Sequence, residues 1–405
     1  MAPTGHCTAG LAAASPESRG LDWLNLFVAN IQTGFGPFVT VYLTTQGWTQ
    51  TSIGLALSLG TITSMASQVP AGALVDAVRS KAMVVLFSVA AFSASALFFA
   101  AWPVPLSVYA AEIVHGFSSC TLGPAIAAIS LDLAGPALLG LRLGRNARFA
   151  SIGNGTGAAL MGACGYYLSE RAVFFLTAAL TLPAIGSLWT LRRPMHNPAV
   201  MPVEPGQPIT RERLSRLLAH RDLLIFAAAA MLFTLANAAM LPLAGATLTR
   251  KAGGAASLLI AACIVLPQLI VAVVSPTIGR LAQTKGRRWV LLLGFGMVPL
   301  RGVLLAVFHA PIPIVLVQAF DGVAASCFGI MVPLVAADIA GRAGRFNVAL
   351  GFIGLAIGLG ATASTGLAGW IADRGGLPVA FLCLAAVGLA AEILVWRAMP
   401  ETRPE

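Results

Sequence analysis

Long runs of apolar residues dominate the chain, and short polar segments separate them. Each run has about 20 residues, the length that an α-helix needs to cross a bilayer. The runs lie at residues 23–43, 51–74, 82–102, 106–131, 149–168, 172–191, 223–248, 256–278, 289–309, 312–339, 347–370 and 377–396. None shows the period-two alternation of outer-membrane strands. The pattern predicts an all-α membrane protein with twelve transmembrane helices.

Composition and charge agree with a protein embedded in a lipid bilayer. Hydrophobic residues make up 58% of the chain and charged residues 10%, and the mean hydropathy is +0.85. With both termini in the cytoplasm, most basic residues fall in cytoplasmic segments. The exceptions are Arg171, Arg250, Lys251 and Arg374 outside, and Arg301 within a helix. The net charge of +10 therefore follows from topology in an inner membrane, and it implies no nucleic-acid partner.

Several common site classes find no support in the residues. The cysteines are scattered among different helices without C-x-x-C spacing, so we expect no metal and no cofactor. The chain carries neither H-E-x-x-H nor G-x-S-x-G, which argues against a membrane-embedded hydrolase and against an enzyme. Residues 1–20 lack the basic start and apolar core of a signal peptide.

The second half of the chain repeats the first. Residues 112–135 align without gaps with residues 318–341, an offset of 206, and Asn30 pairs with Asn237 at nearly the same offset. A repeat of six helices enters the membrane from the same side twice, so the halves are parallel copies. We expect a disordered tail (1–20), an N-terminal bundle (21–191), a cytoplasmic linker with an interfacial helix (192–222), a C-terminal bundle (223–398) and a second tail (399–405).

Two loops carry a recognisable signature. "GALVDAVRSK" (72–81) resembles the loop signature of the major facilitator superfamily, whereas "GRLAQTKGRR" (279–288) keeps the glycines and arginines but has Gln283 in place of the acid. The resemblance implies two six-helix halves that rock around a central cavity. It implies a conformational latch built from Gly72, Asp76, Arg79, Lys81, Asp132, Gly279, Gly286, Arg287, Arg288 and Asp338. The alternative is that these charges only obey positive-inside placement.

The fifth helix bears on the direction of transport. "GNGTGAALMG" (153–162) is similar in part to the glycine motif of proton-driven exporters in this superfamily, with Ala158 for Pro and Met161 for Gly. Close helix packing is the alternative reason for these glycines.

By the resemblance, helices 1, 4, 7 and 10 line the cavity. The candidate substrate-binding residues are Asn30, Thr33, Glu112, His115, Ser119, Asn237, Gln268, Gln318 and Asp321. On helices 4 and 10 these residues recur at helical spacing, and we expect those stripes to face water and substrate.

An acid within the membrane is costly and indicates function. Glu112 and Asp321 are the candidate proton carriers, with His115 beside Glu112 on the same helix face. Arg301 and Asp321 lie at similar depth, so an ion pair is the alternative to a cavity-facing Asp321.

The sequence thus predicts a monomeric secondary transporter that moves a small organic solute by alternating access, driven by protons, outward from the cell. An uptake symporter or uniporter and a non-transporting receptor are the alternatives.

Overall fold

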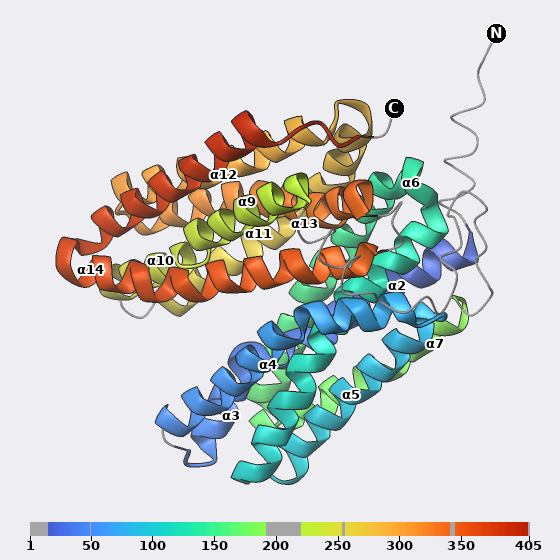
Figure 1. The fold of residues 1–405 in the computed structure, drawn as a ribbon. Helices are drawn as coiled ribbons and strands as arrows, with labels where there is room; N and C mark the ends of the chain where they lie inside the picture. Colours follow the sequence, from blue (N-terminus) through green and yellow to red (C-terminus); the bar gives the residue numbers. More distant parts are fainter. Residues whose placement is uncertain (1–14, 49, 192–219, 253–255, 341–344, 404–405) are drawn as a thin grey trace. The chain divides into compact units, whose positions relative to one another are not determined.

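The computed structural model describes residues 15–48, 50–191, 220–252, 256–340 and 345–403. The chain divides into two compact units, Met1–Gly206 and Gln207–Glu405. The described parts of both are entirely helical, without strands (Figure 1). Unit 1 contains α2 (Pro16–Thr33), α3 (Gly36–Thr45), α4 (Gln50–Ala77), α5 (Lys81–Ala101), α6 (Pro105–Tyr167) and α7 (Glu170–Trp189). Unit 2 contains α9 (Arg221–Asn237), α10 (Met240–Ala252), α11 (Ala256–Thr284), α12 (Arg287–Val307), α13 (Pro311–Ala340) and α14 (Phe346–Ala398).

Each predicted span overlaps described helix, although the boundaries differ from the prediction. Eight helices among the described residues are long and apolar enough to cross a membrane, and two of them are far too long for one crossing. The α6 helix joins the predicted fourth and fifth spans. It breaks at Gly135, where φ is 68°, a backbone conformation that glycine adopts more readily than other residues. The α14 helix joins the last two spans and breaks at Gly376, where φ is 82°.

The first span of each half is divided in two, which the apolar pattern did not predict. The α2 helix ends at Thr33, and α9 ends at Asn237. Pro37 and Pro242 follow these breaks. A proline ring clashes with the carbonyl four residues earlier and donates no N–H, so each proline disfavours a helix that continues through this point.

The start of the chain departs from the prediction, and the end makes contacts that the prediction did not include. Residues 16–20, assigned to the disordered tail, form the start of α2, which Ser15 caps by accepting a hydrogen bond from the Ser18 N–H (3.1 Å). Residues 399–403, assigned to the second tail, contact α11 and α12. The linker and its predicted interfacial helix fall mostly on residues 192–219, outside the described residues.

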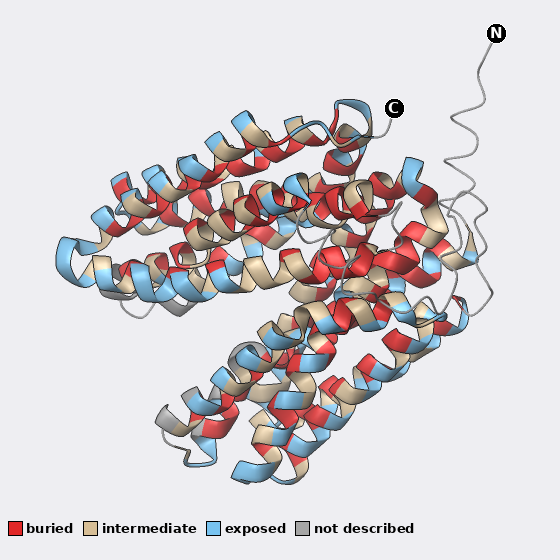
Figure 2. Ribbon diagram, viewed as in Figure 1, coloured by how far each residue is buried: buried red, intermediate tan, exposed pale blue. Residues whose placement is uncertain are grey.

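Within each unit, buried and exposed positions alternate along the helices (Figure 2). Small residues allow close approach: a Cβ on Gly116 of α6 would lie 2.5 Å from the Gly60 carbonyl oxygen of α4. Many exposed side chains are large and apolar, among them Phe87, Leu182 and Val273. Such side chains suit a lipid environment.

Candidate functional site

A buried arginine organises the polar residues of unit 2. Arg301 of α12 is buried, with 1% of its side chain exposed. Its Nη1 donates to the Asp321 carboxylate of α13 (2.7 Å) and to the Asn237 side-chain oxygen at the end of α9 (2.6 Å). Its Nη2 donates to Gln318 Oε1. A guanidinium in an apolar interior is strongly disfavoured unless it is neutralised and hydrogen-bonded, so these three partners stabilise it.

Asp321 therefore pairs with Arg301, the arrangement that the sequence left as the alternative to a cavity-facing acid. The carboxylate still exposes 21% of its side chain. Its Oδ1 receives the bonds from both Arg301 and the Asn237 amide (3.0 Å). Gln318, predicted to face water on the same stripe, is instead fully buried against Arg301.

Glu112 was predicted to face water and substrate, but it does not face open space. The side chain is buried, with 4% exposed, and its carboxylate lies against Gly60 of α4, where an added Cβ would be 2.2 Å from Oε2. The more accessible group is His115, with 22% exposed and its Nδ1 3.8 Å from Glu112 Oε2. The imidazole stacks on Phe35, with ring centroids 4.2 Å apart. Ser119 lies one turn further along, its Oγ 3.5 Å from His115 Nε2.

The repeat explains which residues remain accessible. His115, Ser119 and Gly123 on α6 correspond, at the offset of 206, to Asp321, Ala325 and Gly329 on α13. All six are at least partly exposed, and a Cβ on either Gly123 or Gly329 would meet open space. The buried neighbours Glu112 and Gln318 correspond as well. Each unit therefore presents one equivalent stripe with a single titratable side chain.

The predicted residues of the first helix point toward α6. Asn30 is buried, and its amide donates to the Leu26 carbonyl (2.9 Å) and to Thr156 Oγ1 (3.4 Å). Thr33 is half-buried, and its hydroxyl lies 3.4 Å from Asn154 Oδ1. Both side chains thus serve the contact between α2 and α6, whereas they were predicted as substrate-binding residues of a cavity-lining helix. Gln268 is half-buried on α11.

The predicted latch residues of unit 2 are assembled around the buried Arg287. The guanidinium contacts Asp338 (2.9 Å) and the Ala282 carbonyl (2.7 Å). Gln283, which replaces the acid of the loop signature, accepts a bond from Arg287 (3.1 Å). Gly286 precedes α12 with a φ of 102°.

The C-terminal segment closes over this loop. Glu401 accepts the backbone N–H groups of Arg287 (2.8 Å) and Arg288 (3.2 Å), and the Thr402 hydroxyl donates to Asp338 (3.2 Å). Burial raises the pKa of Glu401, but these backbone bonds, one from Arg403, and the Arg287 charge together hold the pKa below its usual range. The carboxylate caps the positive N-terminal end of α12.

In unit 1 the equivalent loop is held by Lys81. Its ammonium donates to backbone carbonyls at the end of α4, including that of Val78 (2.7 Å). The carboxylates that act on its charge are those of Asp76 and Asp132. Lys81 and Asp132 correspond to Arg287 and Asp338 at the offset of 206. Gly72 and Gly279 are buried within α4 and α11, and Arg79 is exposed.

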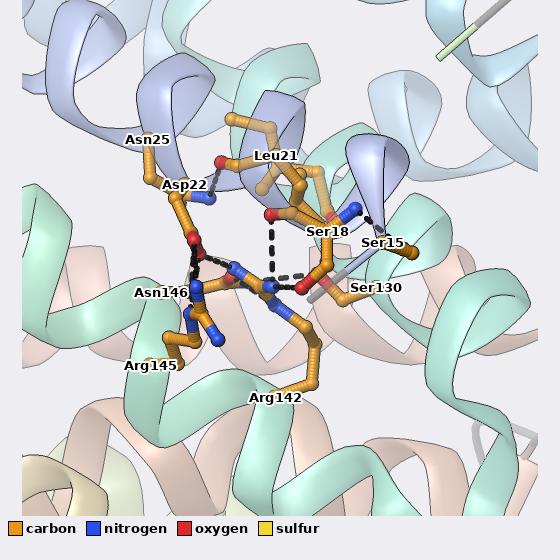
Figure 3. A network of polar contacts seen from close by, with 10 residues as sticks. Ser15, Ser18, Leu21, Asp22, Asn25, Ser130, Arg142, Arg145 and Asn146 are labelled. Carbon is orange, nitrogen blue, oxygen red and sulfur yellow. Dashed lines mark hydrogen bonds and ion pairs between the residues drawn. The ribbon is translucent and has the colours of Figure 1, made fainter. Parts of the chain in front are cut away.

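A further charged network joins α2 to α6, and the sequence pattern did not predict it (Figure 3). The buried Asp22 accepts bonds from Arg142 and from Arg145 Nε (2.9 Å). Arg142 also donates to Ser18 Oγ (2.8 Å) and to Asn146 Oδ1 (2.8 Å). The charge pattern assigns both arginines to a cytoplasmic loop, whereas the helix continues through them. The signal in the sequence that could have indicated this network is Asp22, an acid next to the start of the first predicted span.

Sequence comparison identifies the family of this chain. The Major Facilitator Superfamily matches residues 23–265 and 227–405. The chain belongs to this superfamily. An uncharacterized MFS-type transporter from two strains of Mycobacterium tuberculosis is 36% identical over 402 residues, covering 97% of this chain and 96% of the relative.

Solved structures share the fold. FucP in the outward conformation has a TM-score of 0.73 at 16% identity, covering 95% of this chain and 99% of its own. The human organic anion transporter MFSD10 (TETRAN) has a TM-score of 0.68 at 15% identity, covering 94% and 100%. The superfamily member described here is therefore a multi-pass membrane transporter of small molecules and not an enzyme. In its described residues no cluster of three or more His, Cys, Asp or Glu side chains is placed to hold a metal ion.

Proposed function

We propose that this protein is a proton-coupled secondary transporter that exports a small organic solute by alternating access. The observation that supports the proposal is the pairing of the partly exposed Asp321 with the buried Arg301. A proton on Asp321 would remove the charge that neutralises Arg301, and an unneutralised buried guanidinium is strongly destabilising. Protonation would therefore change the relative stability of two conformations, which is what coupling requires.

The geometry links this charge to a break in the first span of unit 2. Asn237 contacts both Arg301 and Asp321, and it is the last residue of α9. Discontinuous transmembrane helices commonly form the substrate and ion sites of transporters. Loss of the charge on Asp321 would reorganise the hydrogen bonds at the junction of α9 and α10.

Glu112 and His115 form the second candidate for proton binding. Their side chains lie within ion-pair distance, and the imidazole is the accessible member. The carboxylate would stabilise a protonated His115, as a buried acid needs a partner of opposite charge.

Export is favoured by the partial glycine motif at residues 153–162. An uptake symporter or uniporter is the second candidate, because Gly153 and Gly157 pack closely on α2 and this packing alone accounts for those two glycines.

Flux measurements with a single and a double variant test the coupling. Asp321→Asn removes the carboxylate that would bind the proton. The variant should lose solute accumulation driven by a pH gradient and keep solute exchange at equal pH. It should also lower the melting temperature, whereas adding Arg301→Gln should restore the temperature without restoring coupling. A double variant that regains both stability and full coupling removes Asp321 from the mechanism and leaves Glu112 with His115. Solutes for these assays are found by screening a compound library for compounds that raise the melting temperature of the protein.

We propose an inner-membrane location with both termini cytoplasmic, on the strength of the basic residues in the intervening segments. Reporters fused after Glu405 and within residues 192–222 should both be cytoplasmic. A periplasmic signal from either reporter contradicts this topology.

We also propose that the loop charges act as latches that hold one conformation. Asp76→Asn should slow interconversion of the inward-open and outward-open states while solute affinity stays within a few fold, because the loop lies outside the candidate site. Normal interconversion with lost affinity contradicts this role.

A further inference from the structure

The accessible face of α13 indicates the charge of the transported solute, an inference that rests on the proposed transport function. Asp321, Ala325 and Gly329 follow one another at helical spacing and are all at least partly exposed. Leu316, which is exposed on the same helix, lies about two and a half turns from Ala325 and therefore on the opposite side. One exposed side of α13 thus carries a large apolar side chain suited to lipid, and the other carries small residues and a carboxylate.

The ion pair turns its negative end toward this accessible face. Arg301, with 1% of its side chain exposed against 21% for Asp321, is held by Gln318 and Asn237, and its Nε, which has no hydrogen-bond partner in the described part of the chain, is buried too. Both hydrogen bonds to Asp321 end on Oδ1. A ligand on this face therefore meets the second carboxylate oxygen, and it finds no exposed guanidinium donor there.

An aromatic ring completes the same face. Phe328 is half-buried and stacks on Phe233 of α9, with ring centroids 4.2 Å apart. It lies two turns from Asp321, about 10 Å along the helix axis. Ala325, which lies between them, and Gly329, next to Phe328, are exposed small residues, and a Cβ at Gly329 would meet open space. A carboxylate and an aromatic face at this separation suit a cationic group with an apolar body.

We propose that the solute is an organic cation whose ammonium group pairs with Asp321 and whose apolar body lies along Ala325, Gly329 and Phe328. Proton and solute would then compete for one carboxylate. An anionic solute would meet only the negative end of the ion pair.

Charged thiol reagents test the electrostatic part without a known substrate. In a background whose native cysteines are replaced, Ala325→Cys places a thiol one turn from Asp321. Its reaction rates with trimethylammonioethyl methanethiosulfonate and sulfonatoethyl methanethiosulfonate are each divided by the rate with free cysteine. We expect the ratio of the corrected rate with the cationic reagent to that with the anionic reagent to be about ten. Ser119→Cys, at the repeat-equivalent position beside His115, is the matched control and should show a smaller ratio.

Two further variants identify the source of the preference. Asp321→Asn should invert the ratio, because the Arg301 charge remains, and the Asp321→Asn, Arg301→Gln double variant should bring it close to one. If the single variant does not fold, the double variant decides alone. A ratio of one or less in the Ala325→Cys parent, or an unchanged ratio in the double variant, overturns the inference.

A matched set of ligands tests the body of the solute. Phenylbutylammonium should raise the melting temperature of the purified transporter more than phenylbutanol or phenylbutanoate, and the advantage should disappear in the double variant. Equal or greater stabilisation by the alcohol or the carboxylate overturns the assignment. If the transporter binds the ammonium compound but its solute flux does not depend on the pH gradient, the proposed proton coupling is wrong while the cation proposal stands.

Discussion

Removal of the Asp22 carboxylate is the most direct test of the network between α2 and α6. Asp22→Asn leaves Arg142, with 5% of its side chain exposed, without a counter-charge. Breaking a buried pair from one side costs about 3–5 kcal/mol. For a unit of this size that corresponds to a fall in melting temperature of about 6–20 °C. Arg145, with 32% exposed, can turn toward solvent, so Arg145→Gln should cost less than about 1 kcal/mol.

The buried cysteines make the assay specific for one unit. Cys120 of unit 1 is buried, as is Cys327 of unit 2. A maleimide dye reacts with each thiol only after unfolding, so variants that retain a single cysteine report on each unit. Asp22→Asn should advance the labelling of Cys120 more than that of Cys327. If Asp22→Asn and Arg145→Gln destabilise equally, the network does not neutralise a buried charge and the reasoning is wrong.

Two further predictions concern packing and pH. Gly116→Val should separate α4 from α6, because even a Cβ would lie 2.5 Å from the Gly60 carbonyl oxygen. The variant should have a lower melting temperature and lower expression. Gly123→Ala is the control and should change neither, because a Cβ at Gly123 meets open space. Since the pKa of Glu401 is lowered in the folded protein, its contribution to stability is present above the ordinary glutamate range and disappears as the pH falls through the lowered value. Glu401→Gln should therefore reduce the melting temperature at pH 7, and the difference from the parent should vanish well below about pH 4, as melting curves across that range will show.

The candidate site was predicted only in part, and the misses share a cause. Helical spacing placed Asp321 and Gln318 on one face of their helix, but Asp321 is partly exposed and Gln318 is buried. Periodicity gives the direction of a side chain around its own helix, and it does not say which neighbour covers that direction. Glu112 is buried because Gly60 lets α4 come close, which depends on a helix distant in sequence.

The charged networks show the same limit. The offset of 206 is enough to identify Asp132 and Asp338 as equivalent residues. The partner of Arg142 could not be found in this way, because Asp22 lies 120 residues away and has no counterpart in the second half. Counting basic residues explained these arginines as topology signals, which made a second role unnecessary.

The sequence by itself determined the class of the protein, because the length and apolarity of the runs reflect the thickness of the bilayer and leave few alternatives. It also determined the twofold organisation, since a repeat is visible without coordinates. The tertiary structure decided where helices continue: buried Leu139 and Leu143 and the neutralised Arg142 lie on a helix that runs through an apparent loop. It also decided which polar groups stay accessible, because burial and charge neutralisation depend on side chains that only folding brings together.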